Sequence, residues 1–198
     1  MTGHDRPAEN PVAYLTLDSP SGPFHVAATA RGVVAADSET TEEDFVSALR
    51  RRLGAPVVPI GQVPVGDPAR DTLERARPVV EALLADAPVD ASVIELDLAD
   101  RPSWDRRVFE AVRRLGHGET ASYGEIARRI GAPRAARAVG GAIARNPISR
   151  LIPCHRVVGA GRTLGGYGGD GPADRAASLD RKRNLLLAEG VVLVSRRP

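Results

Sequence analysis

Apolar residues along the first forty positions are grouped in short runs bounded by turn residues, in the manner of β-strands. Residues 13–18 and 24–30 are mainly apolar and flank a turn of Ser, Pro and Gly at 19–23. Residues 33–37 continue the pattern after an Arg-Gly turn, and residues 93–98 show it once more. The pattern predicts a small sheet built mostly from the beginning of the chain.

Apolar residues at helical spacing follow these strands. Thr41 is a typical N-cap followed by three acids, and the apolar residues between 45 and 53 recur every three or four positions. Residues 71–85 show the same spacing, with Pro78 placed where it kinks the helix or delays its start. Residues 55–67 are rich in Pro and Gly and are expected to form a loop. No group of residues in this half resembles a catalytic site.

The second half has a mainly helical pattern. Ser103 is expected to cap a first helix. Ser122 and Glu125 form a Ser-x-x-Glu capping box that opens a short helix, and a Gly-Ala-Pro turn at 131–133 leads to another helix over 134–145. Two short helices joined by a turn that contains Gly are the sequence form of a helix-turn-helix.

The sign of the charge changes where the pattern changes. Residues 1–100 carry 17 acidic and 8 basic side chains, whereas residues 101–198 carry 8 acidic and 19 basic ones. Such asymmetry indicates that the second half binds a polyanion. We therefore place a boundary at residues 100–102 and predict an α/β domain over 12–100 and a second domain over 101–195.

Composition narrows the class of protein. With 198 residues and 42% hydrophobic content the chain can build a core, and it has no apolar run of the ~20 residues that a membrane span needs. The polar residues 1–11 show no secretory signal. A single cysteine excludes an internal disulfide and a thiolate-rich zinc site. We expect a monomer in the reducing cytoplasm, with no membrane association, metal or cofactor.

The second helix of the helix-turn-helix combines small residues with arginines. Small side chains let a backbone approach another molecule closely, although tight helix–helix packing explains them equally well. Between residues 126 and 169 there are eight arginines and no acid. An acid-free arginine field across a helix-turn-helix favours binding to a phosphate backbone.

The only cysteine, Cys154, lies between two apolar pairs in residues 151–158, and an extended segment is expected there. A lone cysteine is more often a small buried hydrophobe than a nucleophile, but here His155 follows it and arginines surround it. Because adjacent residues of an extended segment point to opposite faces, a water bridge between thiol and imidazole is more natural than a direct bond. The downstream acids that can orient the histidine are Asp170, Asp174, Asp180 and Glu189.

The Pro-Cys-His-Arg-Val segment at 153–157 resembles the active-site motif of O6-alkylguanine-DNA alkyltransferases, also called methylated-DNA–protein-cysteine methyltransferases. The resemblance runs from Trp104 to Gly190, and residues 14–37 resemble the family's first domain more loosely. It implies an α+β fold, with a small RNase H-like domain of sheet and helices followed by a mostly helical, winged helix-turn-helix-like domain. Four more segments resemble the family in the expected order: 122–127, 135–140, 145–148 and 186–190.

By that resemblance the chain acts once on duplex DNA that contains O6-alkylguanine, and on O4-alkylthymine. After minor-groove binding and base flipping, Cys154 accepts the alkyl group irreversibly. His155 acts as the base through water, and Glu189 polarises it. Tyr123 donates a proton to N3 of the departing guanine, and Asn146 braces the turn that carries the cysteine.

The resemblance also implies a DNA-binding surface and a base pocket. Arg137 fills the gap that the flipped base leaves, which offsets unstacking. Tyr167 and the backbone of Gly168 line the base pocket. The other residues predicted to contact DNA are Tyr123, Arg134, Ala135, Ala136, Ala138, Gly140 and Arg156.

Residues 170–178 depart from the family pattern as an apparent insertion. Pro172 can occupy the first turn of a helix that runs to Glu189, so we favour a last helix that is roughly two turns longer. The alternative is an altered loop beside the base pocket, which changes the alkyl groups that enter.

Three other functions remain open. A non-catalytic lesion-binding protein of the same architecture is the main alternative, but relatives of that kind lack the cysteine. A helix-turn-helix regulator prefers a specific undamaged site. A cysteine hydrolase does not suit the Cys–His adjacency or the arginine field.

Overall fold

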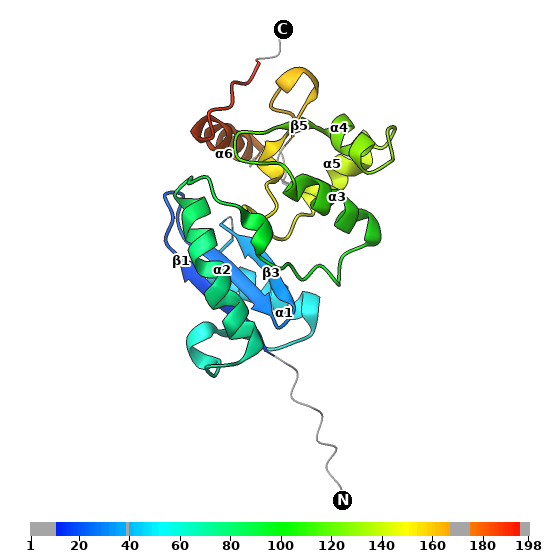
Figure 1. Ribbon diagram of the computed structural model, residues 1–198. Coiled ribbons are helices and arrows are strands. Elements are labelled where there is room, and N and C mark those ends of the chain that lie inside the picture. The colour runs from blue at the N-terminus through cyan, green and yellow to red at the C-terminus, as the bar shows by residue number, and fades with distance from the viewer. Residues whose placement is uncertain (1–10, 39, 167–174, 195–198) are drawn as a thin grey trace, which may run out of the picture.

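The computed structural model describes residues 11–38, 40–166 and 175–194. Figure 1 shows a sheet with helices α1 and α2 in the first half of the chain, and a mostly helical second half above it. The mixed α/β content agrees with the fold class that the sequence predicts.

The first half is built on a four-stranded sheet of order β3-β2-β1-β4. Strand β1 pairs with β2 and β2 with β3 in antiparallel fashion, and β1 pairs with β4 in parallel. The strands at the start of the chain are confirmed to within one residue. The bounds are β1 Val12–Leu17, β2 Phe24–Thr29, β3 Gly32–Asp37 and β4 Val57–Pro59.

Helices cover both faces of this sheet. Helix α1, Glu42–Leu53, is capped by Thr41 as predicted and packs on the face that carries Tyr14 and the other even-numbered residues of β1. Helix α2, Pro68–Leu84, packs on the opposite face against Leu15. Since side chains alternate between the two faces of a strand, a sheet buried on both sides requires nearly every residue of β1 to be apolar.

Two predictions for this half are wrong. The expected loop at 55–67 contains β4 and a 3-10 turn, η1 Ile60–Gln62, because three residues pair with the start of β1. The expected strand at 93–98 is a 3-10 turn, η2 Ala91–Val93, followed by a single bridge between Val33 and Leu96. Strand β3 is the edge of the sheet, and at Val33 its outer side pairs with this short segment over one bridge only.

The second half begins with α3 and contains the expected helix pair. Ser103 is the first residue of α3 and makes no capping hydrogen bond, because Pro102 precedes it at the N-cap, so that expectation is wrong. The capping box is confirmed, with Ser122 N donating to Glu125 Oε2 at 2.6 Å. The bounds are α3 Ser103–Arg113, β5 Ala121–Ser122, α4 Tyr123–Arg129, α5 Ala136–Ala144, η3 Cys154–Arg156, β6 Val157–Val158, η4 Ala160–Arg162 and α6 Arg175–Ala188.

The two halves share one apolar core. A single cluster of buried side chains includes Leu15 and Leu73 from the first half and Phe109 and Ile152 from the second. Backbone hydrogen bonds also join the halves, because Ala36 on the outer edge of β3 bonds to the segment at 147–149. The domain division at residues 100–102 stays a prediction.

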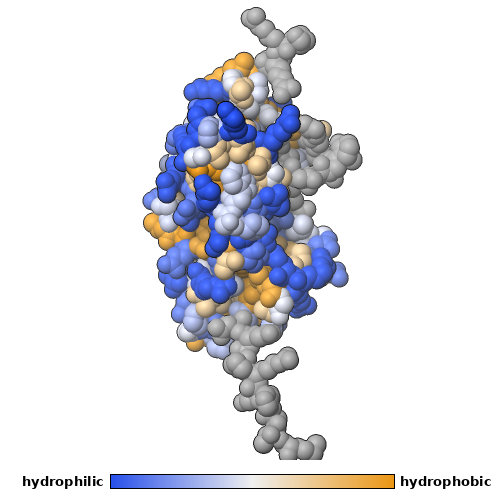
Figure 2. Space-filling model, turned by 90° about the vertical axis from the view of Figure 1, so that its right-hand side faces the viewer, coloured by the Kyte–Doolittle hydropathy of each residue, from blue (hydrophilic) through white to orange (hydrophobic). Residues whose placement is uncertain are grey.

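One face of the molecule can be followed in Figure 2 and is largely hydrophilic. On the face that Figure 2 shows, hydrophilic residues predominate over both halves and hydrophobic ones form smaller patches between them. Among the helices in the described part of the chain, none combines the length and the apolar character that crossing a membrane requires.

Candidate active site

Cys154 begins a 3-10 turn, η3, and the extended segment predicted at 151–158 starts only at Val157. Cys154 N donates to Ile152 O at 2.7 Å, and Arg156 N donates to Pro153 O at 3.0 Å. Strand β6 then pairs in parallel with β5, so that Val157 lies opposite Ala121. The turn is therefore held next to the start of α4, which carries Tyr123.

His155 and Glu189 are in direct contact. His155 Nε2 lies 2.9 Å from Glu189 Oε1, and both side chains are buried. Arg156 donates to both oxygens of the same carboxylate, and Gly118 N donates to Oε2 at 3.1 Å. Burial raises the pKa of Glu189, but hydrogen bonds from His155 and Arg156 outweigh burial and hold that pKa below its usual range. The carboxylate is thus ionised and can only accept hydrogen bonds.

The protonation of His155 follows from that contact. Burial lowers the pKa of His155, and together with the charges of Arg156 and Arg150 it outweighs the opposing effect of Glu189, so the ring is neutral at neutral pH. Because the carboxylate only accepts, Nε2 carries the hydrogen and Nδ1 has the lone pair. His155 Nδ1 is buried and has no hydrogen-bond partner among the described residues. The imidazole is therefore a base without a direct bond to the thiol, which suits transfer through a water.

Asn146 holds the turn that leads to the cysteine. Its Nδ2 donates to Ile152 O at 3.0 Å, and its Oδ1 accepts from Ile148 N at 3.0 Å. Both isoleucines are fully buried. One amide thus closes the turn from within, and the apolar anchors fix the turn in the core.

Tyr123 is the first residue of α4, and its hydroxyl is a hydrogen-bond donor. Its hydroxyl donates to Gly166 O at 2.9 Å. Burial raises the pKa of Tyr123, the bond to Gly166 lowers it by less, and the charge of Cys154 raises it again. The phenol therefore stays protonated at neutral pH.

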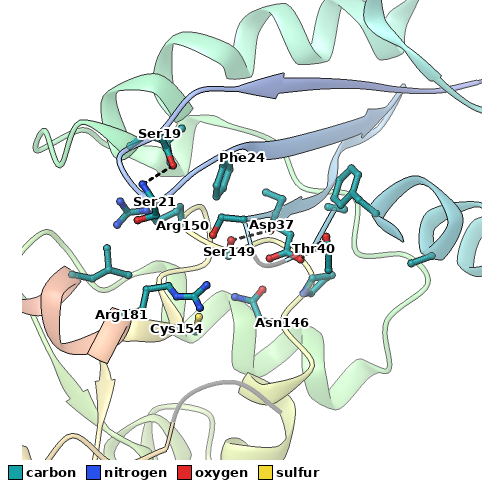
Figure 3. A pocket seen from close by; sticks show the side chains of 18 of the residues that line it. Ser19, Ser21, Phe24, Asp37, Thr40, Asn146, Ser149, Arg150, Cys154 and Arg181 are labelled. Carbon is teal, nitrogen blue, oxygen red and sulfur yellow. Dashed lines mark hydrogen bonds between the residues drawn. The ribbon is translucent and has the colours of Figure 1, made fainter. Parts of the chain in front are cut away.

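A cavity of about 520 Å³ reaches Cys154 from the side of the N-terminal sheet (Figure 3). Asn146 and Ser149 line it on one side, and Arg181 from α6 lies near the thiol on the other. Tyr123 borders a separate hollow of about 840 Å³ formed with residues 163–166. The predicted base-pocket residues Tyr167 and Gly168 lie outside the described residues.

The residues predicted to contact DNA divide into exposed and buried groups. Arg134, Arg137 and Ala138 are exposed at the start of α5, while Ala135, Ala136 and Gly140 are partly buried beside them. Helix α5 begins at Ala136, two residues later than expected, because the turn continues through Arg134.

Arg156 requires a correction. It is 8% exposed, and its guanidinium donates to Glu189 and, at 2.7 Å, to Leu115 O. A guanidinium in that position is not available to a phosphate. Arg156 is instead part of the buried network around the histidine.

Only half of the eight arginines between residues 126 and 169 are without a salt bridge among the described residues. Acids from outside that stretch pair with the other four. The four remaining arginines form no salt bridge within the part of the chain described here: Arg128, Arg134, Arg137 and Arg162. The four pairs are Arg129–Glu119, Arg145–Asp105, Arg150–Asp86 and Arg156–Glu189.

The insertion is described only in part. Residues 175–178 lie in the first turn of α6, as a lengthened last helix requires, whereas residues 170–174 lie outside the described residues. The contact between His155 and Glu189 forms across this insertion.

Sequence reasoning missed Lys182 of α6, which is fully buried. The available signal was that it is the single lysine among 27 basic residues.

Comparison with known proteins gives a consistent set of similarities. The family model described as "6-O-methylguanine DNA methyltransferase, DNA binding domain" matches residues 103–191. A methylated-DNA–protein-cysteine methyltransferase of Mycolicibacterium paratuberculosis is 53% identical over 96 residues, which cover 48% of this chain and 53% of that protein. One of Haemophilus influenzae is 43% identical over 94 residues, or 48% of each chain. The match thus spans about half the length of these curated relatives.

A solved structure covers more of the chain. The Mycobacterium tuberculosis OGT, crystallised in complex with DNA, is 36% identical, with a TM-score of 0.66 over 90% of this chain and 92% of that one. The O6-methylguanine-DNA methyltransferase of Pyrococcus kodakaraensis is 21% identical, with a TM-score of 0.59 over 91% of this chain and 99% of that one. The second likeness shows the fold alone.

Proposed function

The chain belongs to the family of methylated-DNA–protein-cysteine methyltransferases, and we propose that it repairs DNA by single-turnover alkyl transfer to Cys154. The alkyl group comes from O6-alkylguanine, and from O4-alkylthymine, in duplex DNA. The observation that carries the proposal is the buried, neutral His155, whose Nε2 faces Glu189 and whose Nδ1 lone pair has no partner among the described residues.

The reaction is a nucleophilic substitution at the alkyl carbon. Nδ1 of His155 takes the proton of the Cys154 thiol through a water, and Glu189 stabilises the imidazolium that forms. Sγ then bonds to the alkyl carbon while the bond from that carbon to O6 breaks, and the electron pair stays on guanine. The Tyr123 hydroxyl gives a proton to N3 and neutralises the leaving base.

The product explains a single turnover. Cys154 becomes a thioether, and because water at neutral pH does not displace the sulfur from the alkyl carbon, the thiol is not regenerated. Asn146 supports the reaction by fixing the turn before the nucleophile, since a well-oriented nucleophile lowers the barrier.

DNA binding is assigned to the exposed arginines at the start of α5. Small residues there let the helix approach the minor groove, and Arg137 occupies the space left by the extruded nucleotide. Extrusion costs a few kcal/mol of unstacking, which an inserted side chain offsets. The crystallisation of the Mycobacterium tuberculosis relative with DNA supports this assignment.

A reducing compartment is part of the same proposal. The acceptor is a lone cysteine that must remain a thiol until it meets its substrate. The cytoplasm meets that need.

The test is the mass of the peptide that contains Cys154 after incubation with a duplex carrying one O6-methylguanine. We expect one added methyl group per protein molecule and restored guanine in the DNA. Cys154→Ser is the matched control and adds none. Tight binding to the lesion without transfer by the reduced, folded wild type contradicts the proposal and indicates a non-catalytic lesion-binding protein.

A further inference from the structure

Lys182 is a buried charge that the reaction above does not use. It is the only lysine of the chain, and its side chain is fully buried in α6. Its ammonium donates to Val157 O at 2.5 Å and to Gly166 O at 2.9 Å. Helix α6 lies beside the segment that carries Cys154 (Figure 3). The lysine therefore joins that segment to the loop at 159–166.

The Gly166 carbonyl is shared with Tyr123. The Tyr123 hydroxyl donates to the same oxygen at 2.9 Å, and Lys182 Nζ lies 5.9 Å from the centre of the tyrosine ring. A carbonyl that accepts from an ammonium and a phenol is fixed by both. The position of the phenol relative to β6 thus depends on the ammonium.

Keeping a lysine here is costly. Burial lowers the pKa of Lys182 to about 8, against the opposing effect of the Cys154 charge, and a buried ammonium needs hydrogen-bond acceptors to persist. The other 26 basic residues are all arginine. A guanidinium is planar and larger, whereas an ammonium is compact and donates to both carbonyls from one nitrogen, so a lysine suits this enclosed site. The cost and the choice of residue both indicate a functional constraint.

We propose that Lys182 is a positioning residue for alkyl transfer, which fixes the Tyr123 hydroxyl relative to the turn of Cys154 by bridging the Val157 and Gly166 carbonyls. This inference rests on the proposed function. It assigns no contact between Lys182 and the substrate. Its effect on the reaction passes through Tyr123.

The kinetic test is a double-mutant cycle under single-turnover conditions. Lys182→Met, which keeps the length of the side chain, is expected to lower the maximal transfer rate roughly 10- to 100-fold, the size of a lost charge-assisted hydrogen bond. The dissociation constant for DNA should stay within about twofold. Adding Lys182→Met to Tyr123→Phe should cause little further loss, because the two residues act as a unit. Lys182→Arg should be slowed as well.

A stability control separates positioning from folding. Leu186→Ala removes a fully buried apolar side chain of the same helix and no charge. This variant should unfold more easily yet react within about twofold of the wild-type rate once folded. A wild-type rate in Lys182→Met or Lys182→Arg overturns the inference, as does a loss in Lys182→Met that adds in full to that of Tyr123→Phe.

A spectroscopic arm needs no DNA. Lysine-selective isotope labelling gives one side-chain signal, because the chain has one lysine. Blocking Cys154, the only cysteine, with methyl methanethiosulfonate should shift that signal, and Tyr123→Phe should shift it too. An unmoved signal in both cases overturns the inference. If the signal shifts but wild-type protein transfers no alkyl group, the proposed function fails and the bridge itself stands.

Discussion

The turn around His155 and the start of α5 both contain arginines of the arginine-rich stretch. The arginine of the turn is buried, whereas those at the start of α5 are exposed. Arg156 is buried and bonded to Glu189 and to a backbone carbonyl. Arg137 is exposed and forms no salt bridge within the described ranges. A buried charge with partners fixes geometry, whereas an exposed charge remains available to an outside polyanion. We therefore expect the buried region to serve the chemistry and the exposed region to serve DNA binding.

The largest effect is expected from removing the base in the buried region. His155→Gln keeps a polar side chain but has no group that takes a proton at neutral pH. We expect the maximal transfer rate to fall roughly 10²- to 10⁴-fold, the usual contribution of general base catalysis, with little change in DNA affinity. Rapid-quench measurement of methyl transfer over a range of protein concentrations separates the two quantities. An unchanged maximal rate would remove His155 from the mechanism.

The second effect concerns stability. Arg156→Met leaves the buried carboxylate of Glu189 without its main cation, and breaking a buried pair in this way costs about 3–5 kcal/mol of unfolding free energy. Urea denaturation followed by circular dichroism measures it. The matched variant is Arg137→Met, which should change stability by no more than about 0.5 kcal/mol. Equal losses in the two variants would erase the contrast between the regions.

The third effect concerns binding. Arg137→Met is expected to weaken binding to duplex DNA by roughly tenfold and to reduce the slope of log affinity against log salt by about one. Fluorescence anisotropy at several salt concentrations measures both. The control is the same substitution at Arg129, an exposed arginine that is already paired with an acid. It should reduce the slope less. A larger change on substitution of Arg129 than of Arg137 would indicate that the DNA-binding surface lies elsewhere.

The smallest effect is the pH dependence of stability. The pKa of His155 in the folded protein lies below its ordinary value of 6.5. As the pH falls, this histidine therefore takes up a proton in the unfolded chain before it does so in the folded protein. The neutral, buried histidine therefore contributes fully to stability at pH values above about 6.5, the pKa of histidine in the unfolded chain. This contribution is lost as the pH falls below that value. The depressed pKa of Glu189 has the same sign and acts below 4.5. Denaturation midpoints between about pH 8 and pH 5 report the first change, and His155→Gln should lack it.

Local features of the fold could be predicted from the sequence, and features that depend on distant pairing could not. The capping box of Ser122 and the first strands rest on neighbouring residues and are confirmed. Strand β4 escaped prediction because its three residues are defined by pairing with Val12, which lies far back in the chain. Sequence spacing indicates period and caps, but it does not indicate which distant segment completes a sheet.

The candidate site shows the same limit. The contact between His155 and Glu189 could be anticipated, since the histidine needed a downstream carboxylate and the family resemblance indicated which one. The place of Arg156 could not, because its partners Glu189 and Leu115 come to it only through tertiary packing. The 3-10 turn at Cys154 was also missed, because two flanking apolar pairs suit a strand equally well.

The proposed mechanism requires His155 to be a neutral base with its lone pair on Nδ1. Nitrogen-15 NMR of the folded protein tests it directly, since the chain has only four histidines to assign. We expect His155 to show a protonated Nε2 and an unprotonated Nδ1 at about pH 7, and Glu189→Gln to disturb this state. An imidazolium, or a ring with its hydrogen on Nδ1, would contradict it.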